Sequence, residues 1–261
     1  MIDMENINAV REDLERKTFA VQSLIGQRER LLELLTLIAR TVKGNDVAPV
    51  LRAVRETRSQ FLQEVFALAM AGGKRKGFFV EFGACDGLHL SNTYLLETKF
   101  RWRGILSEPA RAWHDALLKN RTAKIEQRCV APDSGKELVF HEAKDPGKSG
   151  NIENKDVDVS KSYNVETISL IDLLRRHGAP RHIDFLSVDT EGTELEILKA
   201  FDFSKHRFGF ISVEQHQRKD GEAITSLMND AGYEPLFLRK PNLSVWSQVS
   251  GFDVWYVPKV G

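Results

Sequence analysis

The amino-acid sequence predicts an α/β fold with a mostly parallel sheet, preceded by an α-helical N-terminal extension. From residue 78 onward, short apolar runs alternate with segments of helical spacing, which is typical of a parallel sheet covered by helices on both faces. The last two apolar runs follow each other without a helix, so they must pair antiparallel. In residues 1–70, apolar side chains instead recur every three or four residues, which is the spacing of amphipathic helices.

The extension is expected to contain two helices. In the first, nine of eleven heptad-like positions are apolar, and these nine are Ile7, Val10, Leu14, Val21, Leu24, Leu31, Leu35, Ile38 and Val42. The second helix is predicted over Val47–Met70. The two helices either form a hairpin packed on the main domain or a coiled coil that joins two copies into a homodimer. The basic segment Ala71–Gly77 is interpreted as a linker, so the domains are placed at 1–70 and 71–261.

The main domain is expected to contain a regular alternation of strands and helices. The five expected core strands are Phe78–Phe82, Gly104–Glu108, Ala123–Val130, Ile183–Asp189 and Phe208–Glu214. The expected helices are Asn92–Lys99, Arg111–Lys119, Ser169–His177, Thr193–Ala200 and Gly221–Ala231. An extra strand is expected at Leu138–His141 and a polar loop at Gly147–Tyr163, and the final strands are Glu234–Leu238 and Phe252–Val257.

The composition argues against a nucleic-acid-binding protein, a disulfide-rich protein and a membrane-spanning protein. Lys plus Arg and Asp plus Glu both number 37, so no global positive field favours a nucleic-acid partner. The two cysteines, Cys85 and Cys129, are too few for a disulfide framework, and reduced thiols fit a cytoplasmic protein. The polar N-terminus is not expected to be a signal peptide, and no apolar run is long enough to suggest a membrane span.

The first predicted strand leads into a glycine turn with the sequence VEFGACDG, residues 80–87. Such a turn can simply connect a strand to a helix. Glu108, however, ends the next strand 21 residues after Gly87, where nucleoside-binding folds place an acid that accepts hydrogen bonds from the ribose hydroxyls. The middle glycine of the dinucleotide fingerprint is missing, which argues against an NAD-dependent enzyme. The acids Glu81 and Asp86 favour a ligand that carries an ammonium group, such as S-adenosylmethionine.

Five blocks resemble the FkbM-type methyltransferases, a branch of the Rossmann-like, class I S-adenosylmethionine-dependent fold. The blocks are VEFGACDG at 80–87, SNT with LE at 91–97, WRGILSEP at 102–109, VETISLIDLL at 165–174 and IDFLSVDTEGTELEIL at 183–198. The resemblance covers about residues 77–257 and implies a seven-stranded sheet with an antiparallel last strand. It also implies methyl transfer to a hydroxyl, often on sugars, glycolipids or polyketide products.

The resemblance further implies roles for individual residues. The residues that it places at the methionine part of the cofactor are Glu81, Gly83, Ala84 and Gly87. Glu108 would hold the ribose, Cys129 and Val130 would border the adenine, and Asn92 would help close the pocket. Asp189 would lie near the methionine end and the reacting centre.

An alcohol acceptor must lose its proton during methyl transfer, and the residues offer two solutions. His216, after the fifth core strand, is a candidate general base, and His89 is a second one. Alternatively, Asp189, Glu214 and Gln215 could hold a divalent cation such as Mg²⁺, and Glu191 could join them. Acids at such positions also simply favour the start of the following helix.

These observations predict an S-adenosylmethionine-dependent O-methyltransferase that acts on a hydroxyl of a saccharide, a glycoconjugate or a secondary metabolite. The alternative within enzymes is an N-methyltransferase for a small amine, which needs no strong base. The alternative outside enzymes is a non-catalytic adaptor in which residues 1–70 do the work beside a vestigial methyltransferase domain. The acids and glycines at the strand ends argue against that adaptor.

Overall fold

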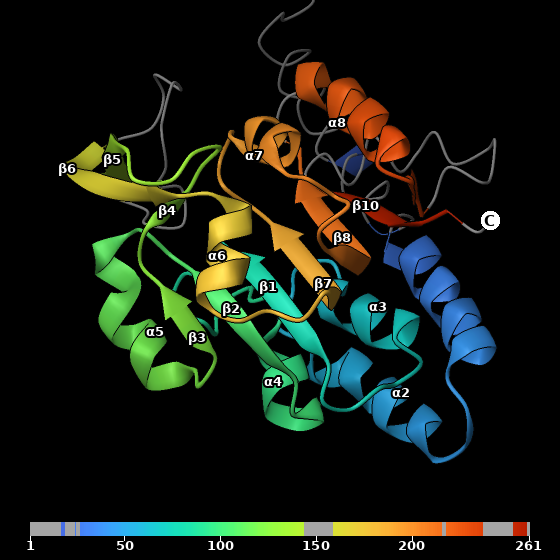
Figure 1. Ribbon diagram of the computed structural model, residues 1–261. Coiled ribbons are helices and arrows are strands. Elements are labelled where there is room, and N and C mark those ends of the chain that lie inside the picture. Colours follow the sequence, from blue (N-terminus) through green and yellow to red (C-terminus); the bar gives the residue numbers. More distant parts are fainter. Residues whose placement is uncertain are drawn as a thin grey trace, which may run out of the picture.

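The computed structural model describes residues 17–18, 24, 27–143, 159–215, 218–236 and 253–259. A seven-stranded sheet lies at its centre, in the order β3-β2-β1-β7-β8-β10-β9 (Figure 1). The strands are β1 (Phe78–Phe82), β2 (Arg103–Ser107), β3 (Lys124–Glu126), β7 (His182–Val188), β8 (Arg207–Glu214), β9 (Tyr233–Pro235) and β10 (Asp253–Pro258). Strands β3, β2, β1, β7 and β8 pair in parallel, whereas β10 is antiparallel to both β8 and β9. The predicted α/β fold with an antiparallel last strand is therefore confirmed.

Helices cover both faces of the sheet because side chains of each buried strand alternate between two hydrophobic clusters. Phe78, Val80 and Phe82 of β1 pack with α6 (Leu170–Arg176), α7 (Glu194–Ala200) and α8 (Arg218–Asp230). Phe79 faces the other way, toward α4 (Tyr94–Phe100), α5 (His114–Asn120) and the N-terminal extension. The short η2 (Arg111–Trp113) precedes α5. Among the helices of the described residues, none combines the length and the apolar character that a membrane crossing requires.

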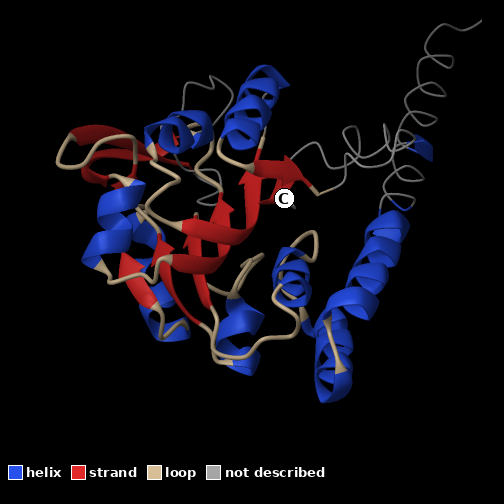
Figure 2. Cartoon of the chain, turned by 45° about the vertical axis from the view of Figure 1, so that its right-hand side comes forward, coloured by secondary structure: helices blue, strands red, loops and turns tan. Residues whose placement is uncertain are grey.

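The N-terminal extension shares its core with the sheet. Its described part comprises a helix over residues 27–41, η1 (Gly44–Asp46), α2 (Val47–Glu56) and α3 (Gln63–Met70). Leu34, Ile38 and Val42 are buried in the same hydrophobic cluster as Phe79 of β1. The helix over 27–41 lies at the flank of the sheet beside β10, away from the strands β5 (Glu137–Ala143) and β6 (Val159–Ile168) (Figures 1 and 2).

The predicted single helix over Val47–Met70 is wrong in the middle, because the chain breaks between α2 and α3. Leu62, just before α3, adopts a left-handed backbone with φ of 68°, which no helix interior allows. The side chain of Gln63 accepts a hydrogen bond from the backbone nitrogen of Phe61 at 2.8 Å, and this bond stabilises the break.

A second sheet of three strands departs from the sequence prediction. The predicted strand Ala123–Val130 is divided, because β3 joins the main sheet whereas β4 (Cys129–Val130) pairs in parallel with β6 (Val159–Ile168). Strand β6 in turn pairs antiparallel with β5 (Glu137–Ala143), which contains the predicted extra strand Leu138–His141. Residues 159–163 of the predicted loop are therefore strand, and residues 147–158 of that loop lie outside the described part.

Candidate functional site

A cavity of about 300 Å³ opens at the carboxyl ends of β1, β2 and β7. The chain leaves β1 toward β2 and β3 on one side, while β7 and β8 lie on the other side, so this is the topological switch point of the sheet. The lining residues are Phe82, Gly83, Cys85, Ser107, Glu108, Pro109, Cys129, Val130, Ala131, Pro132, Leu138, Phe140, Asp189, Thr190, Glu191, Thr193 and Glu196.

The glycine turn after β1 brings the chain against the end of β7. Gly83 has a φ of 69°, and a Cβ atom on it would lie 2.6 Å from the backbone oxygen of Asp189. Gly87 has a φ of 76°, and its Cβ would lie 2.5 Å from Cγ of Arg121. Both positions therefore require glycine, for their backbone conformation and for the space around them.

Glu108 follows β2, and its buried carboxylate lies in the cavity wall. Its oxygens accept hydrogen bonds from the backbone nitrogens of Cys85 and Ala110, both at 2.8 Å. Burial, assisted by Glu142 and Glu81, raises the pKa of Glu108 to about 7. The side chain is therefore tied to the glycine turn and titrates near neutral pH.

Three acids meet where β7 and β8 end. Asp189, Glu191 and Glu214 each offer a carboxylate oxygen within 4.8 Å of the others. Asp189 and Glu191 also line the cavity. Burial raises the pKa of Asp189 well above its ordinary value, and the neighbouring Glu214 raises it further. A carboxylate with a raised pKa is a stronger base than an ordinary aspartate.

The chain also matches a known protein family. The model of the methyltransferase FkbM domain matches residues 81–235, which is more than half of the chain. The chain belongs to the methyltransferase FkbM family. The strands and loops that form the cavity of this FkbM methyltransferase all lie within the matched range, apart from the first residues of β1.

The chain was also compared with solved structures and with curated proteins. The precorrin-6y C5,15-methyltransferase of Geobacter metallireducens GS-15 is a similar solved structure, with 11% identity and a TM-score of 0.39. The similarity covers 74% of this chain and 84% of that one. Among curated proteins, no relative matches the FkbM methyltransferase.

Membership in the FkbM family implies S-adenosylmethionine as the methyl donor, and the cavity agrees with such a ligand. Among the residues that the structure describes, four lining side chains are acids, namely Glu108, Asp189, Glu191 and Glu196, and no lysine, arginine or histidine lines the cavity. A phosphorylated cofactor would lack a cationic partner in this wall, while a sulfonium and an ammonium would be stabilised by it. The apolar side chains of the wall suit an adenine ring.

Several residues predicted from the sequence lie in the lining, and others lie behind it. The lining contains Gly83, Glu108, Cys129, Val130, Asp189 and Glu191. Burial raises the pKa of Cys129 to about 12 and raises that of Cys85 as well, so both thiols stay protonated near neutral pH.

Five other predicted residues support the cavity from outside the lining. Glu81 accepts hydrogen bonds from Ser91 Oγ, Thr93 Oγ1 and the Asn92 backbone nitrogen, while Asp86 accepts from the backbone nitrogens of Leu88 and His89. Ala84 is buried beside the turn, Gly87 packs against Arg121, and the Asn92 amide donates to Ser187 Oγ of β7 at 3.0 Å.

The remaining predicted base and metal residues are Gln215, His216 and His89. Gln215 directly follows Glu214, and its amide nitrogen donates to the hydroxyl of Tyr256 at 3.1 Å. Its part in a metal site stays a prediction. His216 lies outside the described residues. His89 is exposed beside the turn and is not part of the lining.

Sequence reasoning missed the wall that β5 contributes. Leu138 and Phe140 line the cavity, although they follow the glycine turn by about fifty residues in the chain. Their alternation along a predicted extra strand was the available signal, since residues two apart on a strand share a face. Thr190, Thr193 and Glu196 also line the cavity and lie within the sequence block at 183–198.

Proposed function

We propose that this FkbM methyltransferase transfers a methyl group from S-adenosylmethionine to a hydroxyl of a saccharide, a glycoconjugate or a secondary metabolite. Bound S-adenosylmethionine supplies an already activated methyl group on a sulfonium. The protein must therefore orient the acceptor and take up its proton. The observation that carries the proposal is the position of Asp189, in the cavity wall and within the group of three acids.

Asp189 is the residue that suits proton removal best. A carboxylate with an ordinary pKa is a weak base, and efficiency improves as the pKa approaches the working pH. Burial and Glu214 raise the pKa of Asp189 in this direction. In the proposed step the hydroxyl proton passes to the Asp189 carboxylate while the acceptor oxygen takes the methyl group. Glu191 and Glu214 assist by keeping the site negative.

The cofactor is proposed to lie along the cavity with its ribose at Glu108 and its adenine bordered by Cys129 and Val130. A carboxylate after the second strand accepts hydrogen bonds from ribose hydroxyls in this class of fold. The close approach of Gly83 to Asp189 supports a methionine end at the turn, near the proposed base.

Asp189, Glu191 and Glu214 could instead hold a divalent cation that assists the reaction. Carboxylate oxygens are the ligands that Mg²⁺ prefers, and a bound cation would lower the pKa of an acceptor hydroxyl. Turnover that survives EDTA but depends on Asp189 supports the metal-free base. Turnover that EDTA abolishes and Mg²⁺ restores supports the metal.

The test begins with the cofactor and continues with the acceptor. S-adenosylhomocysteine at about a hundred times its dissociation constant should add roughly 2.7 kcal/mol to the free energy of unfolding, whereas NAD should add nothing. Transfer of labelled methyl from S-adenosylmethionine is then measured on matched panels of sugars, phenols and small amines. Methyl ethers as products support the proposal, and methylated amines alone would replace it with N-methyl transfer. No stabilisation by S-adenosylhomocysteine would instead favour the adaptor.

A further inference from the structure

Helix α3 of the extension carries a fully buried acid, Glu64. Its Oε1 accepts hydrogen bonds from Thr57 Oγ1 at 2.7 Å and from the backbone nitrogen of Arg58 at 2.9 Å. Its Oε2 accepts a hydrogen bond from the backbone nitrogen of Leu95 at 2.7 Å. A buried carboxylate is costly unless it is hydrogen-bonded, so these bonds fix the side chain between the extension and the main domain.

The bond to Leu95 anchors the start of α4. Leu95 is the second residue of this helix, where the backbone N–H has no partner within the helix. Thr93, the preceding cap residue, makes no side-chain capping bond. Glu64 therefore supplies the missing cap from another helix, and its negative charge is favourable at a helix N-terminus.

The segment before α4 is bonded in turn to the strands of the cavity. The backbone nitrogen of Asn92 donates to Glu81 Oε1 at 2.7 Å, and Glu81 lies on β1 two residues before Gly83. The Asn92 side chain donates to Ser187 of β7. The start of α4 thus lies directly behind the glycine turn.

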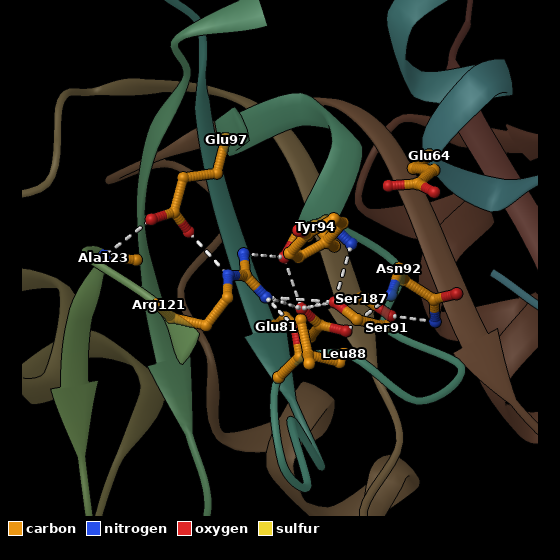
Figure 3. Close-up of polar contacts among 12 residues, drawn as sticks. Glu64, Glu81, Leu88, Ser91, Asn92, Tyr94, Glu97, Arg121, Ala123 and Ser187 are labelled. Atoms are coloured by element: carbon orange, nitrogen blue, oxygen red, sulfur yellow. Dashed lines mark hydrogen bonds and ion pairs between the residues drawn. The ribbon is translucent and has the colours of Figure 1, made fainter. Parts of the chain in front are cut away.

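Arg121 holds the same segment from the other side. Its guanidinium is fully buried and donates to the backbone oxygen of Gly87 at 3.2 Å and to Ser91 Oγ at 3.0 Å. It also pairs with Glu97 of α4, Nε to Oε2, at 2.7 Å. Figure 3 shows Arg121 and Glu97 at one end of this network and Glu64 at the other, with Glu81, Ser91 and Asn92 between them.

We propose that Glu64 is a positioning residue for the cofactor loop, residues 83–93, so that the extension contributes to cofactor binding without touching the cofactor. The inference rests on the proposed function only in that S-adenosylmethionine is the ligand. Loss of the bond to Leu95 releases the start of α4, and the loop that forms the cavity wall at Gly83 and Cys85 relaxes with it.

Glu64→Gln tests this with the smallest change of shape. An amide offers one accepting oxygen, so its NH₂ group must face either the Leu95 N–H or the donors at Thr57 and Arg58. We expect the dissociation constant for S-adenosylhomocysteine, measured by calorimetry well below the melting temperature, to rise about tenfold.

Two control variants separate positioning from general destabilisation. Glu56→Gln makes the same substitution in α2 at an exposed side chain that pairs with Lys99 of α4 at 3.2 Å, and it should bind as the wild type does. Thr57→Val removes one bond to Oε1 but spares Leu95. It should lower the melting temperature of the free protein while changing the dissociation constant less than twofold.

Three results would overturn the proposal. The first is folded Glu64→Gln protein that binds within twofold of the wild type, and the second is an equal loss of affinity in Thr57→Val. The third comes from hydrogen exchange on the wild-type protein, which is informative even if Glu64→Gln fails to fold. Added S-adenosylhomocysteine should slow exchange of the Arg58 and Leu95 amides, and unchanged exchange at Arg58 would refute the coupling. A wild-type protein that does not bind at all would refute the proposed function as well.

Discussion

The buried carboxyl of Glu108 should make cofactor binding depend on pH. Its pKa is raised from 4.5 to about 7 by burial, so the unliganded carboxyl is partly protonated near neutral pH. In the proposed cofactor position the ionised form would accept hydrogen bonds from the ribose hydroxyls, so ligand binding should release the proton. The affinity for S-adenosylhomocysteine should therefore increase as the pH rises from about 6 to about 8, by up to about tenfold per pH unit below the pKa. Calorimetry across this range measures the effect.

Glu108→Gln provides the comparison, because it cannot ionise. It should bind more weakly at the higher pH and show a flat profile. The unliganded wild type should lose stability as the pH rises from about 4.5 to about 7, because the folded protein holds the Glu108 proton in this range whereas the unfolded chain releases it, and Glu108→Gln should lose less. If the affinity for S-adenosylhomocysteine depends equally on pH in the wild type and in Glu108→Gln, Glu108 is not the group that causes the pH dependence.

Substitution of Asp189 by asparagine should raise the stability of the protein but lower its turnover. Asp189→Asn removes the repulsion with Glu214 that helps to raise the pKa, so the melting temperature should rise at about pH 8, by roughly 2–4 °C per kcal/mol. Turnover should fall by about 10²–10⁴-fold, which is the usual contribution of a general base. Glu222→Gln changes an exposed acid of α8 that does not line the cavity and should leave turnover at the wild-type level. Wild-type turnover in folded Asp189→Asn would exclude Asp189 as the base.

The sequence predicted the residues at strand ends better than the residues that support them. The spacing of Glu108 from the glycine turn is short and local, and so it was visible. Glu64 and Leu95 are 31 positions apart, and Arg121 and Gly87 are 34 apart, so their contacts depend on the packing of α3, α4 and α5. A glutamate on an amphipathic helix is normally solvated, and only the tertiary fold buries this one.

At the scale of elements, the β5–β6 hairpin should contribute to affinity through one face. Phe140 of β5 is buried and lines the cavity, whereas the adjacent Val139 is 49% exposed. Burying a phenylalanine contributes about 1.5–3 kcal/mol, so part of this should be lost in Phe140→Ala and the dissociation constant for S-adenosylhomocysteine should rise roughly tenfold. Val139→Ala, on the opposite face of the same strand, should bind as the wild type does. Equal affinities in both variants would mean that the hairpin does not contact the ligand.

The alternation of strands and helices was predictable because each core strand is a continuous apolar run. Strand β6 and the break between α2 and α3 were not predictable, because both depend on residues that are distant in the sequence or on side-chain bonds. Strand β6 is mostly polar from residue 159 to 164 and exposed on its outer face, so its composition resembles a loop. It becomes strand through pairing with β5, which composition cannot reveal. The break between α2 and α3 likewise depends on bonds made by Gln63 and Glu64, whereas the apolar spacing continues across it.

At the scale of the whole molecule, the N-terminal helix has more apolar surface than the fold buries. Within the helix over 27–41, Leu34 and Ile38 are buried in the cluster that contains Phe79 of β1, whereas Leu31, Leu32 and Leu35 are 39%, 45% and 41% exposed. Leu24 is 64% exposed. Leu24, Leu31 and Leu35 belong to the heptad-like stripe that the sequence continues back to Ile7. A heptad repeat of this length is typical of a helix that pairs with another helix, and we expect a second copy of the chain as its partner.

The double substitution Leu31→Glu with Leu35→Glu tests this expectation. Two charges in the apolar stripe should convert a dimer into a monomer, as measured by light scattering coupled to size-exclusion chromatography across a range of concentrations. Leu118→Glu, at a 56% exposed leucine of α5, introduces a charge elsewhere and should leave the dimer intact. Because the cavity is lined by residues 82–196 of one chain, the monomeric variant should keep its affinity for S-adenosylhomocysteine. A wild type that is already monomeric at every concentration would refute the dimer, and the exposed leucines would then require a different partner.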